Sequence, residues 1–302
     1  MSLSQPIFIL ASQRSFTSIV CAMLGQHPQT YGVPEINLLI RETVQELVNV
    51  SRGQSQFIIH GLWRTVAQLY AGEQTVQSID LARRWLNKRL QSTTGEVYQE
   101  LCAKVAPLRI VDKSPAYAEN PEAMLRLRET FPEAHYLYLS RHPKDHGKSV
   151  LRSPQGIASL LNSDSLDYSV DPPSIDPQFA WYRTQKNILA FLETIPQQRQ
   201  MRLRGEDLLS QPRQYLEEIC QWLDLNWSDE IYEVMLRTQE SSFACMGPFG
   251  AQWGNHPGFQ KSPAFRYRQV VPSKNEGALA WREDNQGLKP EVIALLEDLG
   301  YE

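Results

Sequence analysis

The fold is decided by one stretch, Ile7-Phe8-Ile9-Leu10-Ala11-Ser12-Gln13-Arg14-Ser15-Phe16-Thr17-Ser18-Ile19-Val20. Its first five residues are apolar and follow Pro6, which predicts a short buried strand. From Thr17 the apolar residues recur at helical spacing up to Gly25, which predicts a helix that ends there. Backbone N–H groups and the helix dipole can hold an anion in such a strand-to-helix turn. By position, residues 12–18 are therefore a candidate phosphate loop; a polar turn with an exposed arginine is the alternative.

The same order of strand, polar residues and helix recurs along the chain. Further buried strands are predicted at 108–111, 136–140 and 201–204. The second is followed by Asp112-Lys113-Ser114-Pro115 and a helix with Asn120 as its cap, and the third by Arg141-His142-Pro143 and a helix. This alternation predicts an α/β fold with a parallel sheet flanked by helices. Ligand sites of such sheets form beyond the carboxyl ends of the strands.

The remaining segments are assigned by their periodicity. Apolar spacing predicts three helices within 38–90, which form a helical insertion between the first two strands. Segments 153–177 and 241–276 are rich in Ser, Asp, Gly and Pro, so we expect long loops that can act as lids. Helices are expected at 179–192, 210–223 and 290–299. We expect one domain over residues 1–302.

Composition excludes several classes of protein. The net charge of -4 argues against a surface built to bind nucleic acid. The sequence has no apolar run long enough to span a membrane, and its short apolar start lacks a signal peptide's basic region, so a cytoplasmic protein without a membrane partner is expected. The four cysteines lie far apart, which argues against zinc and disulfides and favours buried thiols. No metal site is expected.

Two segments together resemble a known family, the sulfotransferases that use 3'-phosphoadenosine 5'-phosphosulfate (PAPS). Residues 13–18 resemble the family's first loop, PRSGTT or PKSGTT, and Phe16 stands where the family usually has Gly. Residues 139–149 resemble its 3'-phosphate motif, with Arg141 at the strand end and Ser149 eight residues later. Weaker similarities are Asp112–Tyr117 to an EKSPxY segment and Gly205–Pro212 to YEDLxxDP. The resemblance implies a P-loop NTPase-like sulfotransferase fold.

The resemblance also implies a reaction and the residues that carry it. Sulfuryl transfer from PAPS leaves adenosine 3',5'-bisphosphate (PAP) and requires no metal. Lys113 would be a second cation near the transferring group; a strand-end surface charge is the alternative. Arg141 and Ser149 would bind the 3'-phosphate, since an Arg fork and a hydroxyl suit one phosphate. The 5'-phosphate would be held by the loop residues Arg14, Ser15, Phe16, Thr17 and Ser18.

The acceptor needs a general base, and two residues are candidates. Glu35 lies 21 residues after Arg14, in a region where some carbohydrate and tyrosine sulfotransferases have a catalytic Glu. Its alternative role is a first-turn carboxylate of a helix that starts after Pro34. His60 is the rival, because other sulfotransferases use His; a lone His is more often a core or surface residue. Arg266 and Arg268 could add 3'-phosphate contacts but are not assigned.

Two function classes besides the sulfotransferase remain open. The acceptor of a sulfotransferase would be a hydroxyl or amine of a small metabolite or of an acyl chain on a carrier protein, as for similar domains of bacterial polyketide assembly lines. A P-loop small-molecule kinase is weakened by the absence of the GxxxxGK[ST] spacing. A catalytically idle nucleotide-binding module is kept open by Phe16. The candidate site residues that are retained argue against that idle module: Arg14, Glu35, Lys113, Arg141 and Ser149.

Overall fold

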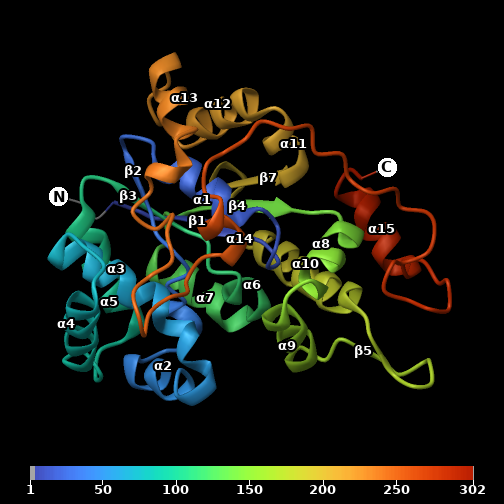
Figure 1. Cartoon of the computed structure of the whole chain (residues 1–302). Helices are drawn as coiled ribbons and strands as arrows, with labels where there is room; N and C mark the ends of the chain where they lie inside the picture. Colours follow the sequence, from blue (N-terminus) through green and yellow to red (C-terminus); the bar gives the residue numbers. More distant parts are fainter. Residues whose placement is uncertain (1–3, 302) are drawn as a thin grey trace.

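The computed structural model describes residues 4–301, and its centre is a five-stranded parallel sheet (Figure 1). The strand order is β2-β3-β1-β4-β7, and every neighbouring pair is parallel. The strands are β1 (Ile7–Leu10), β2 (Thr30–Gly32), β3 (Arg109–Asp112), β4 (His135–Ser140) and β7 (Gln200–Arg204). The expected α/β fold is therefore confirmed. The edge strand β2 was not predicted, because three residues are too few to show a periodic pattern.

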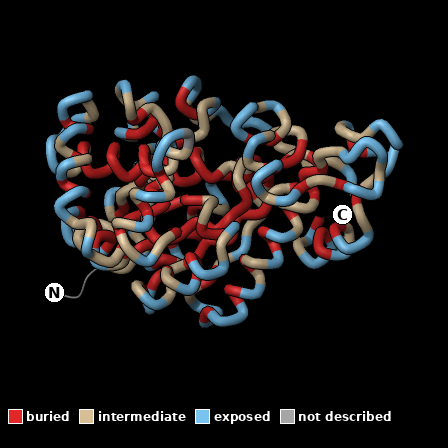
Figure 2. Tube along the Cα trace, turned by 90° about the horizontal axis from the view of Figure 1, so that it is seen from below, coloured by how far each residue is buried: buried red, intermediate tan, exposed pale blue. Residues whose placement is uncertain are grey.

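Helices cover both faces of the sheet because successive strand residues point to opposite faces. Ile7 and Ile9 of β1 pack in one core with residues of α1, α11, α12 and α13. Phe8 and Leu10 pack in a second core, with residues of the insertion and of α7 and α10. Figure 1 shows the two layers, and Figure 2 shows the buried chain along the middle of the molecule. The covering helices named here are α1 (Thr17–Gly25), α7 (Pro121–Thr130), α10 (Pro177–Leu192), α11 (Gly205–Ser210), α12 (Pro212–Trp222) and α13 (Asp229–Met235).

The helical insertion lies between β2 and β3, as expected. Capping boxes begin three of its helices, each with a Thr side chain that accepts a hydrogen bond from the third helical residue. The third of these helices has no counterpart among the predicted ones. The insertion consists of the 3₁₀ turns η1 (Leu38–Ile40) and η2 (Gly53–Ile59) and the helices α2 (Val44–Val50), α3 (His60–Ala71), α4 (Val76–Asn87) and α5 (Thr94–Val105).

Segment 153–177 is not the loop expected from its composition. It contains the helix α9 (Pro154–Asn162) and the antiparallel pair of β5 (Leu166–Asp167) and β6 (Ser174–Ile175). Ser153 and Pro154 are a helix start rather than loop residues: the Ser153 hydroxyl accepts a hydrogen bond from Gly156 N, and Pro154 occupies the first turn. Helix α9 follows α8 (Pro143–Leu151) almost directly.

The pair β5–β6 is fixed by buried charges. The Arg282 guanidinium lies 2.6 Å from Asp167 and 2.8 Å from Asp176, and all three side chains are at most 4% exposed. Segment 241–276 is irregular as expected, apart from the short helix α14 (Pro257–Lys261). The remaining elements are α6 (Ala116–Glu119), the turns η3 (Gln197–Arg199) and η4 (Thr238–Glu240), and α15 (Pro290–Asp298).

Three cysteines are buried thiols, as expected, but Cys245 is exposed. It lies in the irregular segment 241–276. In the part of the chain that the structure describes, no helix is long and apolar enough to cross a membrane. Residues 4–301 also hold no group of three His, Cys, Asp or Glu side chains placed to bind a metal ion.

Candidate functional site

Arg14, Arg141 and Ser149 meet at the carboxyl ends of β1 and β4. These two strands are neighbours, with Leu10 opposite Tyr138, so the residues that follow them emerge side by side. Arg14 Nε donates a hydrogen bond to Ser149 Oγ at 3.0 Å, and Arg141 Nη1 donates to the Arg14 carbonyl at 2.5 Å. The two predicted motifs, about 130 residues apart in sequence, therefore form one cluster.

The loop between β1 and α1 has an unusual backbone. Arg14 (φ 67°) and Phe16 (φ 62°) both adopt the left-handed conformation, which non-glycine residues rarely do. Loops with left-handed residues can turn their N–H groups into an anion-binding concavity. The Ser15 side chain is buried with its hydroxyl 3.2 Å from that of Ser12, and the Ser18 hydroxyl accepts a hydrogen bond from His256 N. Thr17 is the first residue of α1.

Positive charge accumulates at this cluster. Burial lowers the pKa of Arg14, and the nearby Arg141 and Arg152 guanidinium groups lower it further. Burial also lowers the pKa of Arg141; Glu206 and Asp145 oppose that shift, while Arg268 adds to it. Within residues 4–301, the buried Nε of Arg141 has no hydrogen-bond partner. A buried N–H of a cation without a partner is costly unless a ligand accepts from it, so the cluster fits a phosphate group.

Glu35 and Lys113 meet at the carboxyl ends of β2 and β3. In this parallel pair Gly32 lies opposite Val111, which brings the residues beyond both strands together. Lys113 Nζ donates a hydrogen bond to Glu35 Oε1 at 2.6 Å and one to the Gly254 carbonyl at 3.3 Å. The Lys113 side chain is completely buried, whereas that of Glu35 is 32% exposed. Solvent or a substrate can therefore reach the Glu35 carboxylate.

Both structural alternatives for these residues are wrong. Lys113 is not a surface charge, because the side chain is buried. Glu35 does not start a helix, because the first helical turn after it is η1, with Asn37 as its cap. Glu35 lies instead in a segment without helix or strand, and its N–H donates to the Gly254 carbonyl at 2.6 Å.

The Asp112 carboxylate holds the turn that presents Lys113. It accepts hydrogen bonds from the backbone N–H and hydroxyl of Ser114 and from the hydroxyl groups of Tyr98 and Tyr117. Burial raises the pKa of Asp112 to about 6, although these four bonds oppose the shift. The Ser114 hydroxyl in turn accepts from Asn37 N, so the segments that carry Glu35 and Lys113 are joined.

His60 lies close to Glu35 but is less accessible. It is 7% exposed and begins α3, and its Nδ1 accepts a hydrogen bond from Trp253 N at 3.4 Å. Burial, assisted by Arg83 and Arg64, lowers the pKa of His60 to about 4, so the ring is neutral at pH 7. The next residue, Gly61, packs against the Glu35 carbonyl. The start of α3 is therefore held against the Glu35 backbone.

A comparison with protein families matches residues 6–229 to the Sulfotransferase family. This match covers more than half of the chain and includes Arg14, Glu35, Lys113 and Arg141. The chain belongs to the sulfotransferase family. A search of curated proteins gave no match.

Solved structures of sulfotransferases share the fold. A sulfotransferase domain from the curacin biosynthetic pathway is similar with a TM-score of 0.79 and 24% identity, over 100% of this chain and 99% of that one. The sulfotransferase domain of the Synechococcus PCC 7002 olefin synthase has a TM-score of 0.74 and 23% identity, and the match covers 100% of this chain and 97% of that one. A sulfotransferase from Mycobacterium avium has a TM-score of 0.53 and 16% identity, and the match covers 100% of this chain and 78% of that one.

Several residues near the site of this sulfotransferase were not assigned from its sequence. Gly254 contacts both Glu35 and Lys113, but the irregular segment around it gives no signal of that contact. Glu119, at the end of α6, is exposed to solvent, and its carboxylate is close enough to Glu35 for the two charges to interact.

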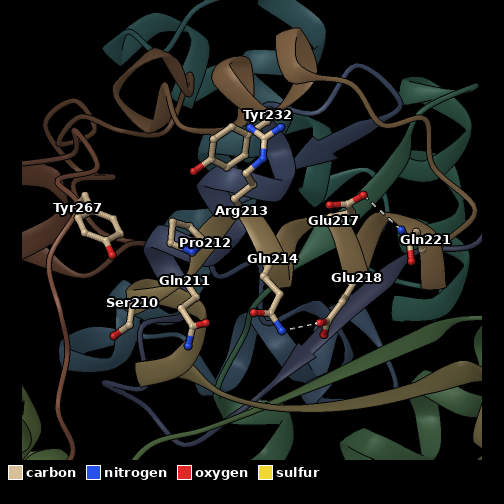
Figure 3. A pocket seen from close by; sticks show the side chains of 10 residues that line it. All are labelled: Ser210, Gln211, Pro212, Arg213, Gln214, Glu217, Glu218, Gln221, Tyr232 and Tyr267. Atoms are coloured by element: carbon tan, nitrogen blue, oxygen red, sulfur yellow. Dashed lines mark hydrogen bonds between the residues drawn. The ribbon is translucent and has the colours of Figure 1, made fainter.

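A surface groove between α12 and α13 contains none of the residues of these two clusters (Figure 3). Glutamine and glutamate side chains of α12 line it together with Arg213, Tyr232 and Tyr267. The Arg213 guanidinium lies 5.1 Å from the centre of the Tyr232 ring. The groove has no buried unpaired cation among the residues that line it, so it carries no assignment.

Proposed function

We propose that this sulfotransferase transfers the sulfuryl group of PAPS to a hydroxyl or amine of a small or carrier-bound metabolite. The convergence of Arg14, Arg141 and Ser149 carries this proposal, because their side chains add hydrogen-bonding groups to the N–H groups of the first loop. A ligand with two phosphate groups can use both. The loop residues 14–18 would hold the 5'-phosphate, and Arg141 and Ser149 the 3'-phosphate.

Glu35 and Lys113 supply the groups that the transfer needs on the acceptor side. An S–O bond to the 5'-phosphate breaks while the acceptor oxygen or nitrogen forms a bond to sulfur, and PAP leaves. Glu35 takes the proton of the acceptor, since its carboxylate is accessible and hydrogen-bonded. Lys113, at 2.6 Å from Glu35, stabilises the negative charge that spreads over the transferring group. Arg14 and the loop N–H groups stabilise the leaving phosphate.

The acceptor class rests on the relatives. The curacin-pathway domain and the olefin synthase domain, both similar over the whole chain, come from a biosynthetic pathway and from a synthase. A metabolite of similar kind, free or attached to a carrier, is therefore the acceptor that we propose. The kinase alternative has no support from a Walker A loop, and the idle module would not need the accessible Glu35 beside Lys113.

The test is calorimetric titration with PAP, with adenosine 5'-monophosphate (AMP), and with ATP and magnesium. We expect tight binding of PAP, weaker binding of AMP and no tight binding of ATP. Arg141→Ala should weaken the binding of PAP by about 1.5–3 kcal/mol, which is the scale of a hydrogen bond to a charged group. The affinity for AMP should stay nearly unchanged. Equal affinity of the wild-type protein for PAP and AMP would overturn the proposed donor; preference for ATP and magnesium would favour the kinase.

A further inference from the structure

Phe16 occupies a position that suits glycine. Its φ of 62° and ψ of 7° are left-handed, and a side chain in this conformation is strained by about 1–2 kcal/mol. Within the resembling loop motif, Gly stands at this place. A strained non-glycine residue in a binding loop suggests that its side chain has a task.

The ring of Phe16 contacts the arginine that we assign to the 3'-phosphate. Arg141 Cζ lies 4.5 Å from the centre of the ring, which is a cation–π distance. The Arg141 backbone is fixed independently, because its carbonyl accepts a hydrogen bond from Trp181 Nε1 at 2.9 Å. With Nη1 bonded to the Arg14 carbonyl, the guanidinium is held by a ring and by a backbone oxygen, and Nε–H stays without a partner among the described residues.

The ring has room only because residue 205 is a glycine. A Cβ placed on Gly205 would overlap Cδ2 of Phe16. Gly205 begins the segment that resembles the YEDL motif, in which a Tyr stands at this place. The chain therefore has an aromatic residue where the first motif has Gly, and Gly where the second motif has an aromatic residue, and the structure puts the two positions in contact.

We propose that Phe16 is a positioning residue for recognition of the 3'-phosphate: its ring holds the Arg141 guanidinium, and it replaces an aromatic side chain at position 205. This inference rests on the proposed use of a 3',5'-bisphosphate nucleotide. It assigns a role to a loop residue that stands where the family usually has Gly. An aromatic ring adds to guanidinium binding without using any of its N–H donors, so these stay available to phosphate.

The experiment compares PAP and AMP affinities of Phe16→Leu and wild-type protein by calorimetry. Leu keeps apolar bulk and the strained backbone but has no π face. We expect PAP affinity to fall about 3- to 30-fold, the range of a partly desolvated cation–π contact, with AMP affinity unchanged. Tyr232→Leu is the matched control, because it removes a ring beside Arg213 in the groove of Figure 3 and should change neither affinity.

A second pair of variants tests the exchange of the two positions. Phe16→Gly relieves the strained backbone and removes the ring, so its PAP affinity should fall while its melting temperature stays close to that of the wild type. Adding Gly205→Tyr to Phe16→Gly should restore most of the PAP affinity. Gly205→Tyr alone should bind PAP more weakly than the double variant does, because the rings of Phe16 and Tyr would then compete for the same space.

The outcomes separate this inference from the proposed function. Lack of PAP preference in the wild-type protein overturns the function and the inference with it. Where the wild type prefers PAP, two results for Phe16→Leu overturn the inference alone. An equal loss of affinity for PAP and AMP would mean that the ring only shapes the loop, and no loss of affinity would mean that the ring has no role in binding. A double variant no better than Phe16→Gly overturns the exchange.

Discussion

The Glu35 side chain is the accessible base candidate, and His60 is the shielded one. We expect Glu35→Gln to lower turnover about 10²-fold or more with PAP affinity unchanged, because Gln keeps the shape but cannot take a proton. His60→Gln should have a modest effect, since the ring is buried. The measurement is turnover with a confirmed acceptor, with PAP binding recorded beside it. Normal turnover of Glu35→Gln together with collapse in His60→Gln would move the base to His60.

At the scale of single residues, the sequence predicts the side chains that come directly after a strand. Arg14, Lys113 and Arg141 each lie a few residues beyond a buried apolar run, and parallel strands bring such residues to one edge. Contacts made by irregular segments are different. Gly254 meets Lys113 across 141 residues, and Phe16 meets Gly205 across the chain. No local pattern marks these pairs, because nothing near either residue depends on the other until the chain folds.

Among the secondary-structure elements, the pair β5–β6 depends on one buried arginine. Replacing Arg282 by Met leaves Asp167 and Asp176 buried without their main partner. We expect a loss of about 3 kcal/mol of unfolding free energy, the low end for breaking a buried pair, since the nearby Lys289 still offers Asp167 a partner. Hydrogen exchange of residues 163–176 should accelerate.

The control for Arg282→Met is Arg213→Met, which breaks an ion pair whose two side chains are 54% and 77% exposed. Arg213→Met should change the unfolding free energy little, because exposed ion pairs usually contribute little to stability. Equal effects of both variants, or unchanged exchange of residues 163–176 in Arg282→Met, would show that the backbone pairing of β5 and β6 is sufficient without the charges.

There are physical reasons why sequence patterns missed some of the elements. β2 is three residues long and gains its place by pairing with β3. The ion pairs that hold β5 and β6 are made by Arg282, which lies more than 100 residues away in sequence. Composition alone therefore indicated a loop. Some longer elements were predicted to the residue: α1 begins at Thr17 and ends at Gly25, as its spacing indicates, and α7 has Asn120 as its cap, whereas the 12-residue α5 was missed.

The stability of the whole molecule should depend on buried histidines. His146, on α8, is 1% exposed, and neither of its ring nitrogens has a hydrogen-bond partner within residues 4–301. Burial, with the charges of Arg141 and Arg14, lowers its pKa to about 3. The unfolded chain binds a proton near pH 6.5, so the neutral folded form loses stability as the pH falls from about 6.5 toward 3.

His146→Leu should remove this part of the pH dependence. At pH 7 the variant should be about as stable as the wild type, because the neutral ring makes no hydrogen bond. At pH 4 it should be more stable by about 3 kcal/mol, since only the wild type is then penalised for excluding a proton. Urea unfolding of both proteins from pH 7 to pH 4 measures the difference. A difference in stability that stays constant over this range would show that His146 takes up a proton without cost in the folded protein.

The contact of Gly61 and Gly254 with the backbone around Glu35 has a consequence for how this protein can be diversified. A Cβ on Gly61 would overlap the Glu35 carbonyl, and one on Gly254, whose φ is +110°, would lie 2.7 Å from Gly61 Cα. This wall beside the proposed base is therefore built from main chain, and substitutions at either glycine cannot reshape it without displacing Glu35. Mutational libraries that seek new acceptors should leave both glycines fixed and vary other positions. The backbone beside the proposed base is then the constant part of this protein, and variation is left to its side chains.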